Sequence, residues 1–140
     1  MSERNRSLLP DYPPRAAYIH VPFCRHRCGY CNFTLIADRD DLMEAYLLAL
    51  EQELSWLENT FQVDTLYLGG GTPSHLPPVL LEQLFQIVLK RFTLADGFEF
   101  TMEANPADIT PDLVAVMKTY QVNRVSLGVQ SFSDRKLAVL

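Results

Sequence analysis

The chain has 140 residues, 48% hydrophobic and 21% charged, a composition typical of one globular domain rather than of a disordered or fibrous chain. Its formal net charge of -5 argues against a nucleic-acid-binding protein, because such proteins need a clustered basic surface. No apolar run approaches the roughly 20 residues that span a bilayer, and residues 1–15 hold charges and prolines instead of a signal peptide. We expect a cytoplasmic protein with no membrane span and no nucleic-acid partner.

Strands and helices alternate along the predicted chain. An irregular lead-in covers residues 1–16, and one domain follows over 17–140. In chain order we predict a strand at 17–21, an amphipathic helix at 40–58, a strand at 64–68 that runs into glycines, a helix at 78–92, a strand at 98–102, a helix capped by Thr110 and opened by Pro111, a strand at 124–130 and the start of a helix at 133.

This alternation predicts an α/β fold of right-handed βα repeats with a parallel sheet. A complete eight-fold barrel needs roughly 200 residues or more, so a barrel of this kind would be represented only by its first half. The last predicted helix has no ending signal, and we expect a longer protein in which a further strand covers the apolar strand 124–130. In such folds the chemistry lies at the carboxyl ends of the strands.

Three cysteines lie in one short loop after the first predicted strand. Cys24, Cys28 and Cys31 have the spacing C-x3-C-x2-C, and an odd number of cysteines in a reducing compartment does not indicate disulfides. Three thiolates are enough for three irons of a [4Fe–4S] cubane, which leaves the fourth iron without a protein ligand. The alternative is a small zinc site, with His20 or His26 as fourth ligand, although structural zinc sites usually use two separated ligand pairs.

Four segments of the sequence resemble radical S-adenosylmethionine (SAM) enzymes of the oxygen-independent coproporphyrinogen III oxidase group. The first runs from Tyr18 through the cysteine loop to Phe33. The others are Gly69-Gly70-Gly71-Thr72-Pro73, then Met102-Glu103-Ala104-Asn105-Pro106, then residues 125–132. The resemblance implies a partial TIM-type barrel that holds a [4Fe–4S] cluster and SAM.

The residues after the third cysteine distinguish two branches of this group. The oxidase branch generally carries another cysteine close behind the position of Cys31, whereas Asn32 and Phe33 stand there. This is more similar to the haem-chaperone branch, called HemW. We therefore expect a tetrapyrrole protein that delivers haem, with the oxidative decarboxylation of coproporphyrinogen III as the alternative, and with a non-catalytic metal-binding fragment as the alternative of another class.

The resemblance also assigns residues to SAM. It implies that SAM chelates the open iron, receives one electron there and yields a 5′-deoxyadenosyl radical, with an electron donor such as flavodoxin or ferredoxin. The implied SAM-contacting residues are Tyr18, Gly70, Gly71, Thr72, Glu103 and Gln130. Four of these residues have a simpler alternative: an inward-facing strand residue for Tyr18, a tight turn for Gly70 and Gly71, and an exposed salt bridge for Glu103. Residues that bind haem would lie beyond residue 140.

Overall fold

Four parallel strands form the sheet at the centre of the fold. The computed structural model describes residues 13–139. The sheet has the order β1-β4-β5-β6, formed by β1 (Ala16–Val21), β4 (Phe61–Gly70), β5 (Phe92–Ala104) and β6 (Arg124–Leu127). All neighbouring pairs are parallel, so the predicted α/β fold of βα repeats is confirmed.

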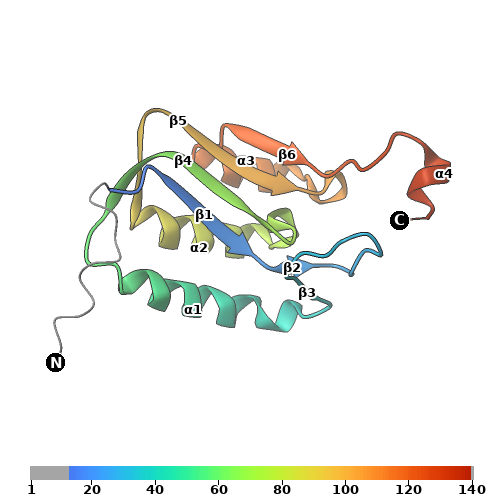
Figure 1. Cartoon of the computed structure of the whole chain (residues 1–140), viewed down its shortest axis with the longest axis horizontal. Helices are drawn as coiled ribbons and strands as arrows, with labels where there is room; N and C mark the ends of the chain where they lie inside the picture. Colours follow the sequence, from blue (N-terminus) through green and yellow to red (C-terminus); the bar gives the residue numbers. More distant parts are fainter. Residues whose placement is uncertain (1–12, 140) are drawn as a thin grey trace.

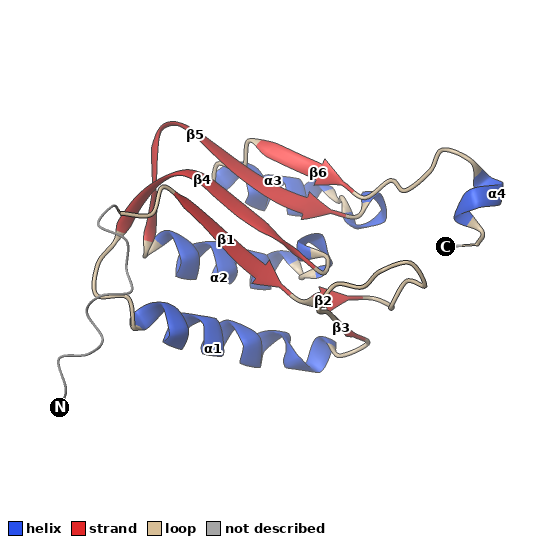
Figure 2. Cartoon of the chain, in the orientation of Figure 1, coloured by secondary structure: helices blue, strands red, loops and turns tan. Residues whose placement is uncertain are grey.

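The three longer helices cover the same face of this sheet (Figures 1 and 2). They are α1 (Met43–Ser55), α2 (Pro78–Leu89) and α3 (Pro111–Thr119). Strand residues that alternate along the sequence meet them and are fully buried, as in Leu66 and Leu68 of β4. The buried residues Leu81, Leu84 and Phe85 of α2 complete the same hydrophobic cluster. The core therefore lies between the sheet and the helices, and none of the helices described within residues 13–139 covers the opposite face of the sheet.

α2 and α3 begin as predicted, α1 begins three residues later than predicted, and α1 and α2 end earlier. Asp40–Leu42 forms a short 3-10 turn, η1, before α1. Thr110 caps α3 as predicted, since its hydroxyl accepts a hydrogen bond from the N–H of Leu113 at 3.2 Å. The helix predicted from residue 133 is confined to α4 (Asp134–Leu137), and Ser133 makes no side-chain capping bond. Within residues 13–139, no helix is long and apolar enough to cross a membrane.

Two strands are longer than predicted because their amino-terminal ends pair with each other. β4 begins at Phe61 and β5 at Phe92, and these two residues are partners in the register. Their rings stack at a centroid distance of 6.3 Å. The helix predicted to reach residue 92 therefore ends at Leu89, and the strand predicted over 98–102 extends in both directions.

The last strand is shorter than predicted and lies at the edge. β6 ends at Leu127, and Gln130 has a positive φ of 61°, which is incompatible with a strand. Val125 is 41% and Leu127 50% exposed. The predicted apolar edge is therefore confirmed, but Gln130 belongs to the loop after the strand.

A second, very small sheet frames the cysteine loop and was not predicted. It pairs β2 (Phe23–Cys24) with β3 (Ile36–Ala37) in parallel. Both strands lie near the carboxyl end of β1, and the cysteine loop connects one to the other (Figure 1). The N–H of Ile36 donates to the carbonyl of Pro22 at 2.8 Å, so the loop between the two strands is closed at its base. β1 itself begins at Ala16, one residue inside the predicted lead-in, of which residues 1–12 lie outside the described residues.

Candidate functional site

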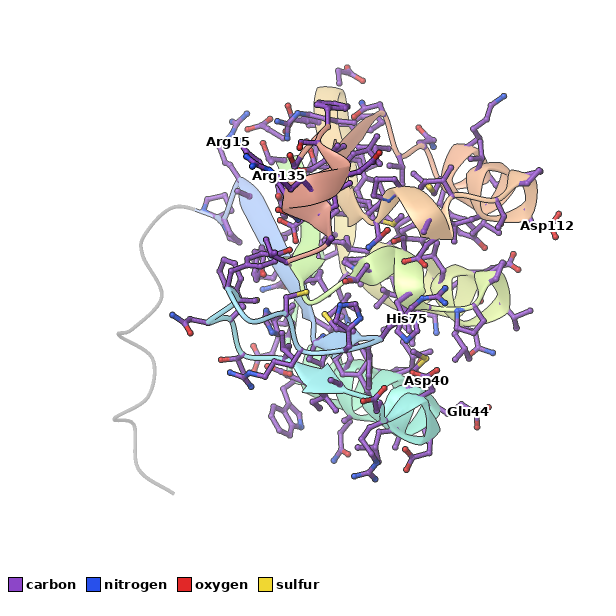
Figure 3. All side chains as sticks on the ribbon, turned by 90° about the vertical axis from the view of Figure 1, so that its right-hand side faces the viewer. Arg15, Asp40, Glu44, His75, Asp112 and Arg135 are labelled. Atoms are coloured by element: carbon purple, nitrogen blue, oxygen red, sulfur yellow. The ribbon has the colours of Figure 1, made fainter. Side chains whose placement is uncertain are left out.

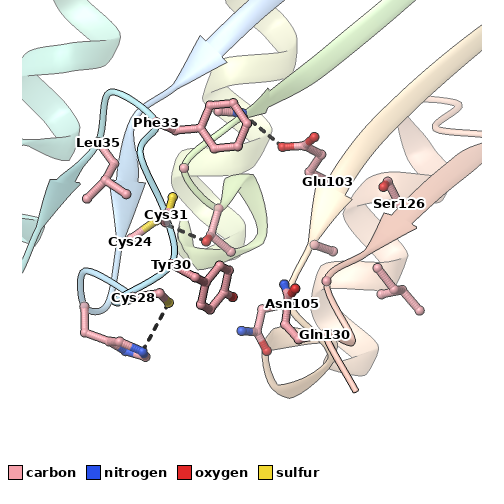
Figure 4. Close-up of a pocket in the computed structure, with 17 residues that line it drawn as sticks. Cys24, Cys28, Tyr30, Cys31, Phe33, Leu35, Glu103, Asn105, Ser126 and Gln130 are labelled. Atoms are coloured by element: carbon pink, nitrogen blue, oxygen red, sulfur yellow. Dashed lines mark hydrogen bonds between the residues drawn. The ribbon is translucent and has the colours of Figure 1, made fainter. Parts of the chain in front are cut away.

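One pocket at the carboxyl ends of the strands gathers nearly all the predicted site residues (Figure 4). Its volume is about 260 Å³. The predicted residues that line it are Cys24, Cys28, Cys31, Gly70, Gly71, Thr72, Glu103 and Gln130. They come from the cysteine loop, from the last residues of β4 and β5, and from the segments that follow β4 and β6, as expected for a parallel α/β sheet.

The three thiols belong to the cysteine loop but differ in their contacts. Cys24 Sγ lies 3.3 Å from the hydroxyl of Thr72, so the thiol at the start of the loop touches the segment after β4. Cys28 Sγ lies 3.6 Å from His26 Nε2. Burial raises the pKa of the Cys24 thiol, the Thr72 hydrogen bond lowers it, and the Cys31 and Cys28 thiols raise it again.

The three thiols suit an iron–sulfur cluster by their chemistry. Cys24, Cys28 and Cys31 line one cavity. In a cubane each cysteine binds a different iron, so three thiols are the donor set for a [4Fe–4S] cluster with one iron left open. Within residues 13–139, no three His, Cys, Asp or Glu side chains converge closely enough to hold a single metal ion.

Glu103 is held at the rim of the pocket by two donors. One carboxylate oxygen accepts from the Tyr67 hydroxyl at 2.7 Å and the other from the N–H of Gly70 at 3.0 Å. The bond to Glu103 raises the pKa of Tyr67. These bonds fix the carboxylate beside the glycine segment, and they replace the exposed salt bridge considered from the sequence.

Gly70 and Gly71 are required by close packing against the base of the cysteine loop. Gly70 has φ +117°, and a Cβ there would lie 2.4 Å from the ring of His20. A Cβ on Gly71 would lie 2.6 Å from the backbone of Pro22 and Phe23. The N–H of Gly71 donates to the carbonyl of Val21 at 2.8 Å. The glycines thus join β4 to the cysteine loop and also leave their backbone open to the pocket.

Tyr18 does not line the pocket and reaches it only through neighbours. Its side chain is 56% exposed, so the inward-facing alternative is wrong for this chain. Its ring stacks on Tyr67 at a centroid distance of 5.9 Å, and Tyr67 holds Glu103. The Tyr18 hydroxyl also lies 3.1 Å from His20 Nδ1, while His20 Nε2 lies 2.8 Å from the carbonyl of Thr34. Because a carbonyl only accepts, Nε2 carries a proton and donates to Thr34, while Nδ1 shares a hydrogen bond with the Tyr18 hydroxyl.

Several lining residues were missed from the sequence, among them Asn105, Ser126 and Gly128. All three lie inside the segments that carried the resemblance, but nothing in their residue type marks them as lining the pocket. Tyr67 was missed as the partner of Glu103, since the two side chains meet only through the pairing of β4 with β5. Strand alternation was the available signal, because Tyr67 stands between the buried Leu66 and Leu68 and therefore faces the other side of the sheet.

Comparison with known families agrees with this arrangement. The sequence profile of the radical SAM superfamily matches residues 18–140. The chain belongs to the radical SAM superfamily. Members of this superfamily use a [4Fe–4S] cluster and SAM, and the matched region includes the cysteine loop and the rest of the pocket.

Relatives within this radical SAM group carry two different names. The chain is 40% identical over 124 residues to the "Heme chaperone HemW" of Lactococcus lactis, covering 89% of this chain and 32% of the relative. It is 38% identical over 131 residues to the "Oxygen-independent coproporphyrinogen III oxidase" of Bradyrhizobium diazoefficiens, covering 90% and 29%. The chain thus spans about a third of the length of these relatives.

A solved structure of a radical SAM enzyme shares the fold. Coproporphyrinogen III oxidase (HemN) from Escherichia coli superposes with a TM-score of 0.79 at 32% sequence identity. The match covers 89% of this chain and 30% of HemN. This chain therefore has the fold of a portion of the HemN structure, and its parallel strands and helices correspond to that radical SAM fold.

Proposed function

We propose that this chain binds a [4Fe–4S] cluster through Cys24, Cys28 and Cys31, binds SAM in the adjoining pocket, and serves the delivery of haem. Residues 17–140 are its radical SAM core. The observation that carries the proposal is the convergence of the three thiols, the glycine segment and Glu103 on one cavity, from segments far apart in the sequence.

The protein groups around the cavity have separate tasks in this proposal. Cys24, Cys28 and Cys31 would hold the cluster, which would supply one electron to SAM at its open iron, while the protein fixes the geometry. Glu103, fixed by Tyr67 and Gly70, accepts from the cationic amino group of SAM. Gln130 and Thr72 offer an amide and a hydroxyl to the ribose and methionine parts. Tyr18 acts indirectly, because its ring packs against Tyr67.

Haem delivery is favoured over the oxidase reaction by the cysteine loop and by the relatives. Asn32 and Phe33 follow Cys31 in place of another cysteine. Proteins named HemW are among the relatives that are 40% identical to this chain. The oxidative decarboxylation of coproporphyrinogen III is the second candidate, since a relative with the oxidase name is 38% identical. In either case a small electron-transfer protein such as flavodoxin or ferredoxin supplies the electron.

Cluster content tests the proposed ligands. The wild-type chain and three single variants, Cys24→Ala, Cys28→Ala and Cys31→Ala, are reconstituted anaerobically with iron and sulfide. We expect each variant to lose the cluster, because two thiolates hold a cubane far less securely than three. Thr34→Ala is the matched control in the same loop, since it keeps the carbonyl that faces His20. Full iron content in any cysteine variant, or stoichiometric zinc without iron in the wild type, would contradict the proposal.

The choice between chaperone and oxidase is tested on this chain joined to the downstream sequence of a relative. We expect that protein to bind haem and transfer it to an apo-haemoprotein, as followed by haem absorbance. Conversion of coproporphyrinogen III without haem transfer would favour the oxidase instead.

A further inference from the structure

We propose that the short 3-10 turn η2 (Pro73–His75) clamps the cysteine loop on both sides, Ser74 through Asp108 and Arg25, and His75 through Asp40. These are positioning residues. None of them is a proposed ligand of the cluster or of SAM.

The first arm of the clamp is a buried carboxylate. The side chain of Asp108 is only 4% exposed, and it lies in η3 (Pro106–Asp108), just after β5. One carboxylate oxygen accepts from Arg25 Nη2 at 2.8 Å, and the other accepts from the Ser74 hydroxyl at 3.0 Å. Ser74 Oγ in turn accepts from the N–H of Asn105 at 2.9 Å. Since Arg25 directly follows Cys24, this network ties the start of the cysteine loop to two segments of the sheet edge.

The second arm holds the far side of the loop. Asp40 opens η1, three residues after β3 closes the small sheet. His75 Nε2 lies 2.9 Å from Asp40 Oδ1, and Figure 3 shows these two side chains beside one another. The side chain of His75 is largely buried while that of Asp40 is exposed. The donors of the two arms, Ser74 and His75, are consecutive residues, so one rigid turn reaches both flanks of the loop.

The loop needs such anchors because its own backbone has few. At its base, the N–H of Ile36 donates to Pro22 at 2.8 Å, and that of Asp38 to Cys24 at the long distance of 3.4 Å. Inside the loop the N–H of Cys31 donates to the carbonyl of Cys28 at 3.1 Å. The side chain of Arg25 is 67% exposed, so its ion pair gains little as a surface contact. Its guanidinium instead neutralises a buried carboxylate, which is costly to leave unpaired.

The positioning role rests on the proposed function, but the clamp itself can be measured without any metal. Hydrogen–deuterium exchange is followed by NMR on the metal-free 140-residue chain, with the amides of Ile36 and Asp38 as reporters of the loop base. We expect exchange about tenfold faster in Arg25→Met and in Asp40→Ala, which corresponds to ~1.4 kcal/mol of lost local protection. Amides in the centre of β4 keep their wild-type rates.

Two matched variants separate the clamp from general effects of charge. Arg27→Met removes the same charge from the same loop, and Asp41→Ala removes the neighbouring acid, which pairs only locally with Arg39. Both should exchange at wild-type rates. Asp108→Asn added to Arg25→Met should bring no further acceleration at these amides, because without Arg25 the bond between Ser74 and Asp108 no longer reaches the cysteine loop.

The outcomes distinguish the clamp from the function. Equal exchange in Arg25→Met and Arg27→Met, or in Asp40→Ala and Asp41→Ala, overturns the clamp. In reconstituted protein, iron should be lost to a chelator faster from Arg25→Met than from Arg27→Met; equal rates overturn the positioning role. Failure of the wild type to assemble a cluster defeats the proposed function, while the exchange rates still decide the clamp.

Discussion

The two faces of the sheet are built from the same strands but differ in what their side chains do. On the helix-covered face, Leu66, Leu68 and Phe100 are fully buried and make only apolar contacts with the core cluster. On the open face, Tyr67 and Glu103 bond to each other next to the pocket. Alternate residues of one strand thus serve stability and chemistry separately.

The difference between the two faces indicates where a substitution would affect stability and where it would affect binding. A change on the covered face removes packing that the whole sheet shares, whereas a change on the open face removes a bond that only the pocket uses. Variants on the two faces should therefore affect different measurements, namely the free energy of unfolding and the affinity for SAM.

The largest expected effect on stability is on the covered face. Phe100 is fully buried and packs edge-on against Phe85 at a centroid distance of 5.5 Å. Phe100→Ala should lower the free energy of unfolding by about 3–5 kcal/mol, through lost burial and the cavity left behind. Urea unfolding followed by circular dichroism measures it. A loss below about 1 kcal/mol would mean that the covered face does not hold the fold together.

Gly70→Ala tests the close contact between the end of β4 and His20, next to the cysteine loop. The φ of +117° at Gly70 opposes a side chain, and a Cβ there would lie only 2.4 Å from the His20 ring. We expect a loss of about 1–3 kcal/mol from backbone strain alone, and in addition a displaced cysteine loop with lower cluster content. Gly97→Ala is the matched control, since its φ is +73° and nothing lies within 4 Å of a Cβ there. If both variants lose the same stability and keep the same iron content, the close contact with His20 contributes neither to stability nor to the position of the cysteine loop.

Glu103→Gln should change binding without changing the fold. We expect SAM to bind about tenfold more weakly, because the bond from a cationic amino group to a carboxylate is worth about 1.5–3 kcal/mol. The cluster spectrum and the melting temperature should stay close to those of the wild type. Glu99→Gln is the control on the same strand, where Glu99 lies beside Arg124 at 3.5 Å. Isothermal titration measures the affinity of both variants for SAM. Equal affinities would mean that Glu103 has a structural role and does not bind SAM.

The smallest effect is expected from the exposed pair of Arg15 and Asp64 at the amino end of the sheet. Hydrogen bonding to Arg15 lowers the pKa of Asp64. A carboxylate with a lowered folded pKa contributes stability above its unfolded pKa and loses it as the pH falls through the folded value. Asp64→Asn should leave the melting temperature almost unchanged at pH 7, and any difference should vanish in acid. A large loss at pH 7 would show that exposed charges matter more to this sheet than its core geometry suggests.

Local patterns predicted the elements well, because the information lies within each segment. The βα alternation, the starts of α2 and α3 and the Thr110 cap follow from apolar spacing and capping chemistry. The extension of β4 and β5 could not be predicted this way, since Phe61 and Phe92 form strand only by pairing with each other. The end of β6 was also missed, because Gln130 adopts a positive φ that its residue type does not require.

The site was predicted through motifs, but its internal contacts were not. Cys24, Gly70, Glu103 and Gln130 were named from the sequence, and they line one pocket. The contacts between these side chains depend on the register of neighbouring strands. That register is set by pairing across the whole sheet, so it could not be predicted from one segment. Tyr18 lies opposite Tyr67 in this register, and the packing of the two rings could not be read from either segment alone.

The most direct test of the central claim is the electron paramagnetic resonance spectrum of the reconstituted, reduced chain with and without SAM. If the three cysteines leave one iron open and Glu103 faces it across the pocket, SAM should shift the cluster signal in the wild type. The shift should need higher SAM concentrations in Glu103→Gln than in Glu99→Gln. A fully assembled cluster whose spectrum is indifferent to saturating SAM would contradict the claim that this pocket joins the cluster to SAM.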